Sequence, residues 1–125
     1  MKIAYCILVH RSPNILSKLI RSLNGSGYCF VHVDSKSDMK EFKQACNEVD
    51  NVHFVDNRRK VSWAGWSVVQ AYMLLLEAAF HSNIKFDRFV LLTGEDYPIM
   101  SNKDIVQQFE QNRNIEYVMA YNIAD

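Results

Sequence analysis

The stretch that decides the fold is Phe86-Asp87-Arg88-Phe89-Val90-Leu91-Leu92-Thr93-Gly94-Glu95-Asp96-Tyr97-Pro98-Ile99. Its apolar run at 89–92 predicts a buried strand, and Pro98 cannot continue a strand or helix begun before it. Between them, Glu95 and Asp96 place two adjacent carboxylates on a tight turn at the carboxyl end of that strand. Because ligands bind at this end of open α/β sheets, the turn predicts a ligand site. A solvated polar turn is the alternative.

Strand and helix patterns alternate along the rest of the chain. Strands are predicted at 2–9, 28–33, 52–55, 88–92 and 115–120. Helices are predicted at 13–23, from 37 or 38 to about 47, at 67–81 and at 102–110, with Ser12 as the N-cap and Pro13 in the first helical position of the first. This order predicts an α/β domain, with a Rossmann-like, mostly parallel sheet and flanking helices, as a single unit over residues 1–125.

The composition excludes several classes of function. Fourteen basic residues balance fourteen acidic ones, so no net field attracts nucleic acid or an anionic membrane. The three cysteines lack CxxC or Cys/His spacing, which argues against a disulfide framework and a zinc site; Cys6 and Cys29 fit core positions. The apolar run 3–9 is too short for a signal anchor. We therefore expect a cytoplasmic protein that binds no nucleic acid.

Three polar segments follow predicted strands, at 10–12, 32–36 and 93–97. If the strands are parallel neighbours, these segments meet at one edge of the sheet, where a nucleotide is a common ligand. Asp34 has the chemistry to accept hydrogen bonds from a ribose or a base, and Lys36 to meet a phosphate. No GxGxxG or GxxxxGK[ST] motif is present, which disfavours a dinucleotide or P-loop site.

The histidines and the tryptophan-rich segment leave alternatives open. His10 follows the first strand as a candidate ligand contact, although satisfaction by backbone groups is the commoner role. His32 alternates with Val31 and Val33, so it faces the other side of the sheet. His53 and His81 have the pattern of structural or exposed residues.

Trp63 and Trp66 flank Gly65 just before the helix at 67–81. They either pack the helix start against the sheet or border an anion site, with Gly65 permitting close approach and Ser67 capping the helix or contacting the ligand. Arg58 begins a short basic cluster that suits either a phosphate or a solvated loop.

Four segments in this order resemble the core-2/I-branching N-acetylglucosaminyltransferase and peptide O-xylosyltransferase family. They lie at 6–10, 32–37, 63–71 and 89–99. The resemblance implies a glycosyltransferase A-type fold, present here in part. It also implies inverting transfer of a sugar, N-acetylglucosamine or xylose, from a UDP-sugar to a glycan or protein acceptor. Family members lack the Asp-x-Asp metal motif, as does this sequence, so the resemblance implies no divalent metal and no cofactor. Basic side chains would neutralise the leaving diphosphate instead.

The resemblance also implies roles for individual residues. His10 and Asp34 would line the nucleotide-sugar site, and Trp63, Gly65 and Ser67 would shape its wall. The basic side chains of Lys36 and Arg58, singled out above by their chemistry, complete the predicted site. Glu95 and Asp96 match the acidic turn near the donor sugar; they are the candidate catalytic carboxylates, and orientation of sugar hydroxyls is their alternative role. Ala64 and Met100 depart from the family pattern, which puts local phosphate or acceptor contacts in doubt.

The family's catalytic domains are longer than this chain, and their acceptor groove, base and diphosphate-binding residues lie mostly in the second half. We therefore interpret the chain as the N-terminal, donor-binding part of such an enzyme, catalytically silent alone. An uncovered sheet edge would favour a homo-oligomer. The alternative is a non-enzymatic nucleotide-binding α/β module or inactive fragment; a flavodoxin-like or receiver domain fits less well. Absence of an anchor favours a bacterial glycan-assembly enzyme, cytoplasmic or peripheral to the inner membrane.

Overall fold

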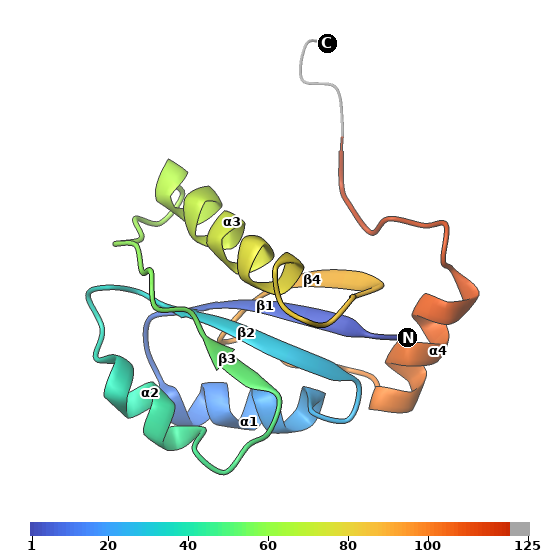
Figure 1. Ribbon diagram of the computed structural model, residues 1–125, viewed down its shortest axis with the longest axis horizontal. Helices are drawn as coiled ribbons and strands as arrows, with labels where there is room; N and C mark the ends of the chain where they lie inside the picture. The colour runs from blue at the N-terminus through green and yellow to red at the C-terminus, as the bar shows by residue number, and fades with distance from the viewer. Residues whose placement is uncertain (121–125) are drawn as a thin grey trace.

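The computed structural model describes residues 1–120. Its strands are β1 (Ile3–Val9), β2 (Gly27–Val33), β3 (Val52–Phe54) and β4 (Arg88–Thr93). Its helices are α1 (Pro13–Leu23), α2 (Met39–Ala45), α3 (Trp66–Phe80) and α4 (Asn102–Gln111). This order confirms the predicted alternation as far as α4 (Figure 1).

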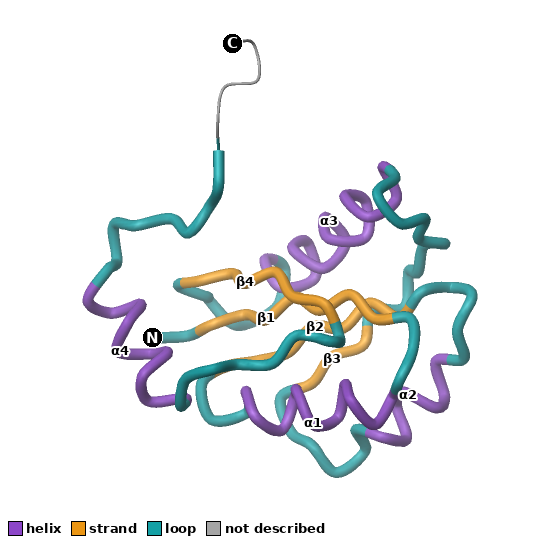
Figure 2. The backbone as a smooth tube through the Cα atoms, turned by 180° about the vertical axis from the view of Figure 1, so that it is seen from behind, coloured by secondary structure: helices purple, strands orange, loops and turns teal. Residues whose placement is uncertain are grey.

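The four strands form one sheet in the order β3-β2-β1-β4 (Figure 2). Every neighbouring pair is parallel, and Leu8 of β1 lies opposite His32 of β2 and Thr93 of β4. The prediction of a Rossmann-like parallel sheet with flanking helices is therefore confirmed. Parallel pairing brings the carboxyl ends of β1, β2 and β4 to the same edge.

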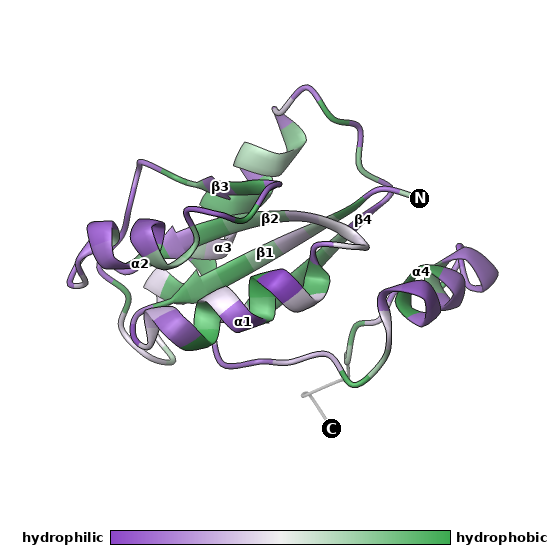
Figure 3. Cartoon of the chain, turned by 90° about the horizontal axis from the view of Figure 1, so that it is seen from below, coloured by the Kyte–Doolittle hydropathy of each residue, from purple (hydrophilic) through white to green (hydrophobic). Residues whose placement is uncertain are grey.

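Helices cover both faces of this sheet, with α1 and α2 on one face and α3 on the other (Figure 1). The alternation of β1 explains the two layers, because successive side chains of a strand point to opposite faces. Ile3, Tyr5 and Ile7 pack with the buried leucines of α1, whereas Ala4 and Cys6 pack against α3. Figure 3 shows the hydrophobic colour concentrated along the strands, while α2 is mostly hydrophilic.

The cysteines behave as core residues. Cys6, Cys29 and Cys46 are free thiols and buried, which confirms the prediction for the first two. Burial raises the pKa of the Cys6 and Cys29 thiols to about 12. Both thiols are therefore protonated and inert at neutral pH.

The start of α1 confirms Ser12 as the N-cap and Pro13 as the first helical residue. Ser12 does occupy the N-cap position, but it has a φ of 60° and its side chain makes no capping hydrogen bond. Instead, the Ser12 carbonyl accepts the N–H groups of Ile15 and Leu16 at 3.0 and 3.1 Å. Ser12 makes no side-chain bond because this left-handed backbone conformation replaces the extended one that a capping serine needs.

The predicted strand at 115–120 is also wrong, since these residues adopt no strand and are exposed. An apolar pattern shows that a segment has a face to bury. A strand also needs a neighbouring strand to pair with, which the pattern does not supply. Here the guanidinium of Arg88 donates to the carbonyls of Ile115 at 2.6 Å and Asn112 at 2.7 Å. Those bonds hold the start of the segment against Arg88, the first residue of β4, and residues 115–120 form no strand beside it.

The β4 side of the sheet is the least covered part of the fold. β4 is an edge strand among the described residues, and its Phe89 and Leu91 are exposed. α4 has no buried residue of its own.

Within residues 1–120, no helix combines the length and apolar character that crossing a membrane requires.

Candidate functional site

A pocket of about 240 Å³ opens at the carboxyl edge of β1, β2 and β4, on the face that α3 covers. We call it the carboxyl-edge pocket. Its lining residues come from all three strand ends, the Trp63 segment and α3: Leu8, Val9, His10, Arg11, His32, Asp34, Val61, Trp63, Val68, Tyr72, Thr93, Gly94 and Glu95. The three polar segments named from the sequence therefore do share one site.

Asp34 is the buried carboxylate of this pocket and is only 3% exposed. Its carboxylate accepts the backbone N–H of Lys36 at 2.9 Å and the N–H of Val61 at 3.3 Å. The ammonium of Lys36 lies 3.5 Å from the same carboxylate and donates to the Val61 carbonyl at 2.9 Å. Since a carboxylate offers about four lone-pair sites, one remains for a ligand.

Arg58 and Lys36 brace the loops beside the pocket and do not line it. The Arg58 guanidinium donates to the carbonyls of Asp34 at 3.2 Å and Ser37 at 3.0 Å. Both cations are thus occupied by the chain itself. Their role as nucleotide contacts stays a prediction.

His10 and Trp63 both border the pocket. His10 is exposed after β1, and its carbonyl accepts the Ser37 hydroxyl at 2.6 Å, which ties the first two strand-end loops together. Trp63 is 87% exposed, and Trp66 is also exposed. The alternative that these rings pack the helix start against the sheet is therefore wrong.

Gly65 and Ser67 lie at the start of α3 and do not line the pocket. Gly65 is the N-cap residue with extended backbone. A Cβ at this position would lie 3.1 Å from the Ser62 carbonyl oxygen, so the glycine permits the tight turn before the helix. The hydroxyl of Ser67 accepts the Ser62 N–H at 2.7 Å, and this bond fixes the segment that carries Trp63.

The two carboxylates of the acidic turn point to different places. The Asp96 carboxylate accepts the Thr93 N–H at 2.7 Å and closes the turn. Glu95 lines the carboxyl-edge pocket, where its Oε1 accepts Nε–H of Arg11 at 2.5 Å. This hydrogen bond holds the pKa of Glu95 below its ordinary value, so Glu95 is ionised at neutral pH.

Gly94 allows the acidic turn to lie against β1. It is buried, its N–H donates to the Leu8 carbonyl at 2.8 Å, and a Cβ there would lie 2.6 Å from Cγ2 of Val9. A larger residue would push the turn away from the pocket.

His32 is a pocket residue that the site prediction omits, although the alternation of β2 correctly puts it on the face opposite Val31 and Val33. It is fully buried, and its Nε2 accepts the Arg59 N–H at 2.9 Å. Burial lowers its pKa, so the ring is neutral and carries its proton on Nδ1. Nδ1 has no hydrogen-bond partner among the described residues.

Arg11 and Tyr72 are pocket residues that the site prediction omits as well. The Tyr72 hydroxyl donates to the Leu92 carbonyl at 2.9 Å, which joins α3 to β4 behind the pocket. The helical pattern of α3 places Tyr72 on its apolar face but gives no sign of a pocket there. Arg11 lies in the polar segment 10–12, but the sequence gives no sign of its hydrogen bond with Glu95.

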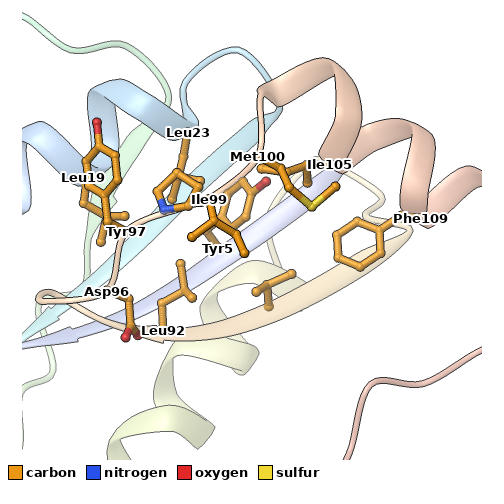
Figure 4. A pocket seen from close by; sticks show the side chains of 12 residues that line it. Tyr5, Leu19, Leu23, Leu92, Asp96, Tyr97, Ile99, Met100, Ile105 and Phe109 are labelled. Atoms are coloured by element: carbon orange, nitrogen blue, oxygen red, sulfur yellow. The ribbon is translucent and has the colours of Figure 1, made fainter.

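A second pocket, the apolar pocket, has a volume of about 270 Å³ and lies between α1, β4 and α4 (Figure 4). Its lining is almost wholly apolar: Tyr5, Leu19, Leu23, Val90, Leu92, Asp96, Tyr97, Pro98, Ile99, Met100, Ile105 and Phe109. Asp96 is the charged member of that lining. The acidic turn therefore contributes one carboxylate to each pocket.

In residues 1–120, no group of three or more His, Cys, Asp or Glu side chains is arranged to hold a metal ion. A family model described as Core-2/I-Branching enzyme matches residues 3–124. The chain belongs to this family. The four segments at 6–10, 32–37, 63–71 and 89–99 all fall within the match, which confirms the resemblance drawn from them.

Relatives of this Core-2/I-Branching chain include two kinds of named transferase. A probable beta-1,3-galactosyl-O-glycosyl-glycoprotein beta-1,6-N-acetylglucosaminyltransferase 7 of Sus scrofa is 29% identical over 118 residues, which cover 90% of this chain and 27% of that protein. Beta-1,3-galactosyl-O-glycosyl-glycoprotein beta-1,6-N-acetylglucosaminyltransferase 3 of Homo sapiens is 33% identical over 111 residues, covering 84% and 25%. Xylosyltransferase 2 of Homo sapiens is 25% identical over 126 residues, covering 97% and 15%. The chain thus spans about a quarter or less of the curated relatives it matches.

Proposed function

We propose that this chain forms the donor-binding part of an inverting glycosyltransferase that takes N-acetylglucosamine or xylose from a UDP-sugar. One observation carries the proposal: the carboxyl-edge pocket gathers polar groups from three parallel strand ends around a buried carboxylate, Asp34. This is the edge at which open α/β sheets bind nucleotides. The names of the relatives support a sugar as the transferred group.

In this proposal the nucleotide lies along the pocket. Leu8, Val68 and Tyr72 offer an apolar wall for a planar base, and the remaining lone pair of Asp34 accepts a base N–H or a ribose hydroxyl. His10 and the exposed ring of Trp63 border the same end. Gly65 and Ser67 act indirectly, through the loop that holds Trp63, and Lys36 and Arg58 act through the loop after β2.

The proposed reaction is a single displacement at the anomeric carbon, with UDP as the leaving group. It needs a carboxylate that accepts the proton of the acceptor hydroxyl. Glu95 is ionised but bound to Arg11, and Asp96 is bound to the Thr93 N–H. These contacts suit orientation better than proton transfer: we assign Glu95, which lines the carboxyl-edge pocket, to orienting a sugar hydroxyl, whereas Asp96 closes the turn and faces the apolar pocket.

Several broader features belong to the same proposal. We propose a glycosyltransferase A-type fold, a donor site that works without a divalent metal or another cofactor, and a glycan or a protein as the acceptor. The absence of Asp-x-Asp from the sequence supports the metal-free site. We also propose a cytoplasmic location, and a homo-oligomer formed through the open edge of β4.

A second candidate function is nucleotide binding without catalysis. The observation that favours it is the engagement of both carboxylates of the acidic turn by groups of the chain itself. A module of this kind would bind UDP and UDP-sugars equally well and transfer nothing.

Chemical-shift mapping of the ¹⁵N-labelled chain tests the site. Titration with UDP in EDTA should perturb the amides of 8–11, 33–37 and 93–95, and ADP at the same concentration should perturb them less. The amides around the apolar pocket, such as Leu19 and Phe109, serve as the internal control. Perturbation confined to that control set, or equal effects of ADP and UDP, would contradict the proposal.

A further inference from the structure

Arg11 and Glu95 form an ion pair at the mouth of the carboxyl-edge pocket. Nε of Arg11 lies 2.5 Å from Oε1 of Glu95, and the side chains are 65% and 46% exposed. Arg11 follows β1 and Glu95 follows β4, so two neighbouring parallel strands hold the pair in register. Both residues line the pocket.

Stability does not explain this pair. An exposed ion pair contributes only about 0–1 kcal/mol. The chain has a comparable pair elsewhere, Arg113 with Glu110, at 55% and 39% exposure and far from the pocket. What distinguishes Arg11 is its position, because its guanidinium is held at the opening of a site that would contain a nucleotide.

The guanidinium of Arg11 keeps hydrogen-bonding capacity after pairing. Glu95 takes the Nε–H, and within residues 1–120 the Nη groups make no hydrogen bond to the protein. Arg11 is the arginine or lysine among the residues that line the pocket, whereas nearby Lys36 is bound by Asp34 and the Val61 carbonyl and Arg58 by two carbonyls. Arg11 therefore offers the donors that a negatively charged ligand can reach.

We propose that the Nη groups of Arg11 bind the diphosphate of the nucleotide, and that Glu95 is a positioning residue that holds the guanidinium by accepting its Nε–H. This inference rests on the proposed function and assigns a residue to the diphosphate of the proposed nucleotide. A guanidinium is planar and always charged, and it matches two phosphate oxygens with two parallel N–H groups. A fixed cation there also favours departure of the negatively charged diphosphate.

The test compares uridine with UDP, because only UDP carries the diphosphate. Calorimetric titrations in EDTA would use the wild-type chain, Arg11→Gln and the matched control Arg113→Gln. We expect Arg11→Gln to weaken UDP binding about tenfold while uridine binding stays the same. Arg113→Gln should leave both affinities unchanged, and the Arg11 effect should shrink as ionic strength rises.

The role of Glu95 is tested by two substitutions that remove the same charge. Glu95→Gln keeps an oxygen to accept Nε–H, whereas Glu95→Ala does not. If Glu95 positions Arg11, the alanine variant binds UDP about threefold or more weakly than the glutamine variant. In an Arg11→Gln background the two variants should bind alike.

The outcomes separate this inference from the proposed function. If wild type binds UDP and Arg11→Gln weakens uridine and UDP equally, Arg11 does not contact the diphosphate, but the donor site stands. If Glu95→Ala and Glu95→Gln bind UDP equally, Glu95 acts by charge alone and its positioning role is wrong. If the folded wild type binds neither ligand, both proposals fall.

Discussion

The two pockets of this chain share a turn and differ in almost every other respect. The carboxyl-edge pocket lies under α3 and combines an apolar wall with charged and polar groups from three strand ends. The apolar pocket lies on the opposite side of β4, between α1 and α4, and Asp96 is its charged lining residue. Glu95 and Asp96 are adjacent in sequence, yet each serves a different pocket.

This difference predicts separate roles for the two pockets, ligand binding for the carboxyl-edge pocket and stability for the apolar pocket. Polar groups gather where parallel strands end, because the loops there are open to solvent and form the edge at which such sheets bind ligands. The apolar pocket instead continues the core of α1 and β1, with Leu19 and Leu23 in its wall. Changes in the first pocket should alter affinity, and changes in the second should alter the free energy of unfolding.

The largest expected effect is on the apolar side. Leu19 is fully buried, so Leu19→Ala removes core contacts and leaves a cavity. We expect it to lower the free energy of unfolding by about 2–5 kcal/mol, measured by urea denaturation. The folded variant should keep the wild-type affinity for UDP. A loss of less than about 1 kcal/mol would mean that α1 does not support this core.

A smaller effect is expected where the two pockets meet. Gly94→Ala would place a Cβ 2.6 Å from Cγ2 of Val9, a β-branched side chain with little freedom to turn. We expect a loss of about 1–3 kcal/mol in unfolding free energy. Gly25→Ala is the control, because its Cβ would meet the end of the Asn102 side chain, which is able to rotate away. Equal losses for both variants would contradict the close approach of the turn to β1.

Stability should also depend on pH through His32. Burial lowers its pKa below the ordinary value of 6.5, so the unfolded chain takes up a proton before the folded chain does. The stability that neutral His32 contributes is therefore complete above about pH 6.5 and is lost as the pH falls through the lower folded value. Thermal unfolding between pH 5 and 8 should show this slope, reduced in His32→Gln and retained in His53→Gln, where the histidine is exposed. Identical slopes in all three proteins would remove His32 as the cause.

The smallest expected effect on the fold concerns the open edge of β4. Leu91 is exposed beside it, and uncovered apolar edges favour pairing between chains. Sedimentation at micromolar concentration should detect a dimer or higher oligomer of the wild type. Leu91→Lys should sediment as a monomer and change unfolding free energy by no more than about 0.5 kcal/mol. A strictly monomeric wild type would contradict this expectation.

The sequence was sufficient for the four strands and for the polar segments that meet at the carboxyl edge of the sheet. Apolar runs and their turns placed all four strands, and parallel pairing then determined which polar segments meet. The sequence was not sufficient where the structure of a segment depends on contacts with residues far away in the chain. The segment 115–120 has the pattern of a strand, but Arg88 binds the carbonyls just before and at its start.

Side-chain contacts limited the prediction of the site in the same way. Arg58 was expected at the ligand, yet its guanidinium is bound to the carbonyls of Asp34 and Ser37, a pairing that no local pattern reveals. Arg11 was left out because its partner Glu95 is more than eighty positions away in the chain. Its significance depends on the pairing of β1 with β4.

Binding of UDP and UDP-N-acetylglucosamine is the decisive measurement on the carboxyl-edge pocket. Calorimetric titration in EDTA would compare the wild-type chain with Asp34→Ala, each checked for folding by circular dichroism. We predict metal-independent binding of both ligands by the wild type and loss of that binding in a folded Asp34→Ala variant. No binding by the folded wild type, or undiminished binding by Asp34→Ala, would contradict the claim that the carboxyl-edge pocket is the donor site.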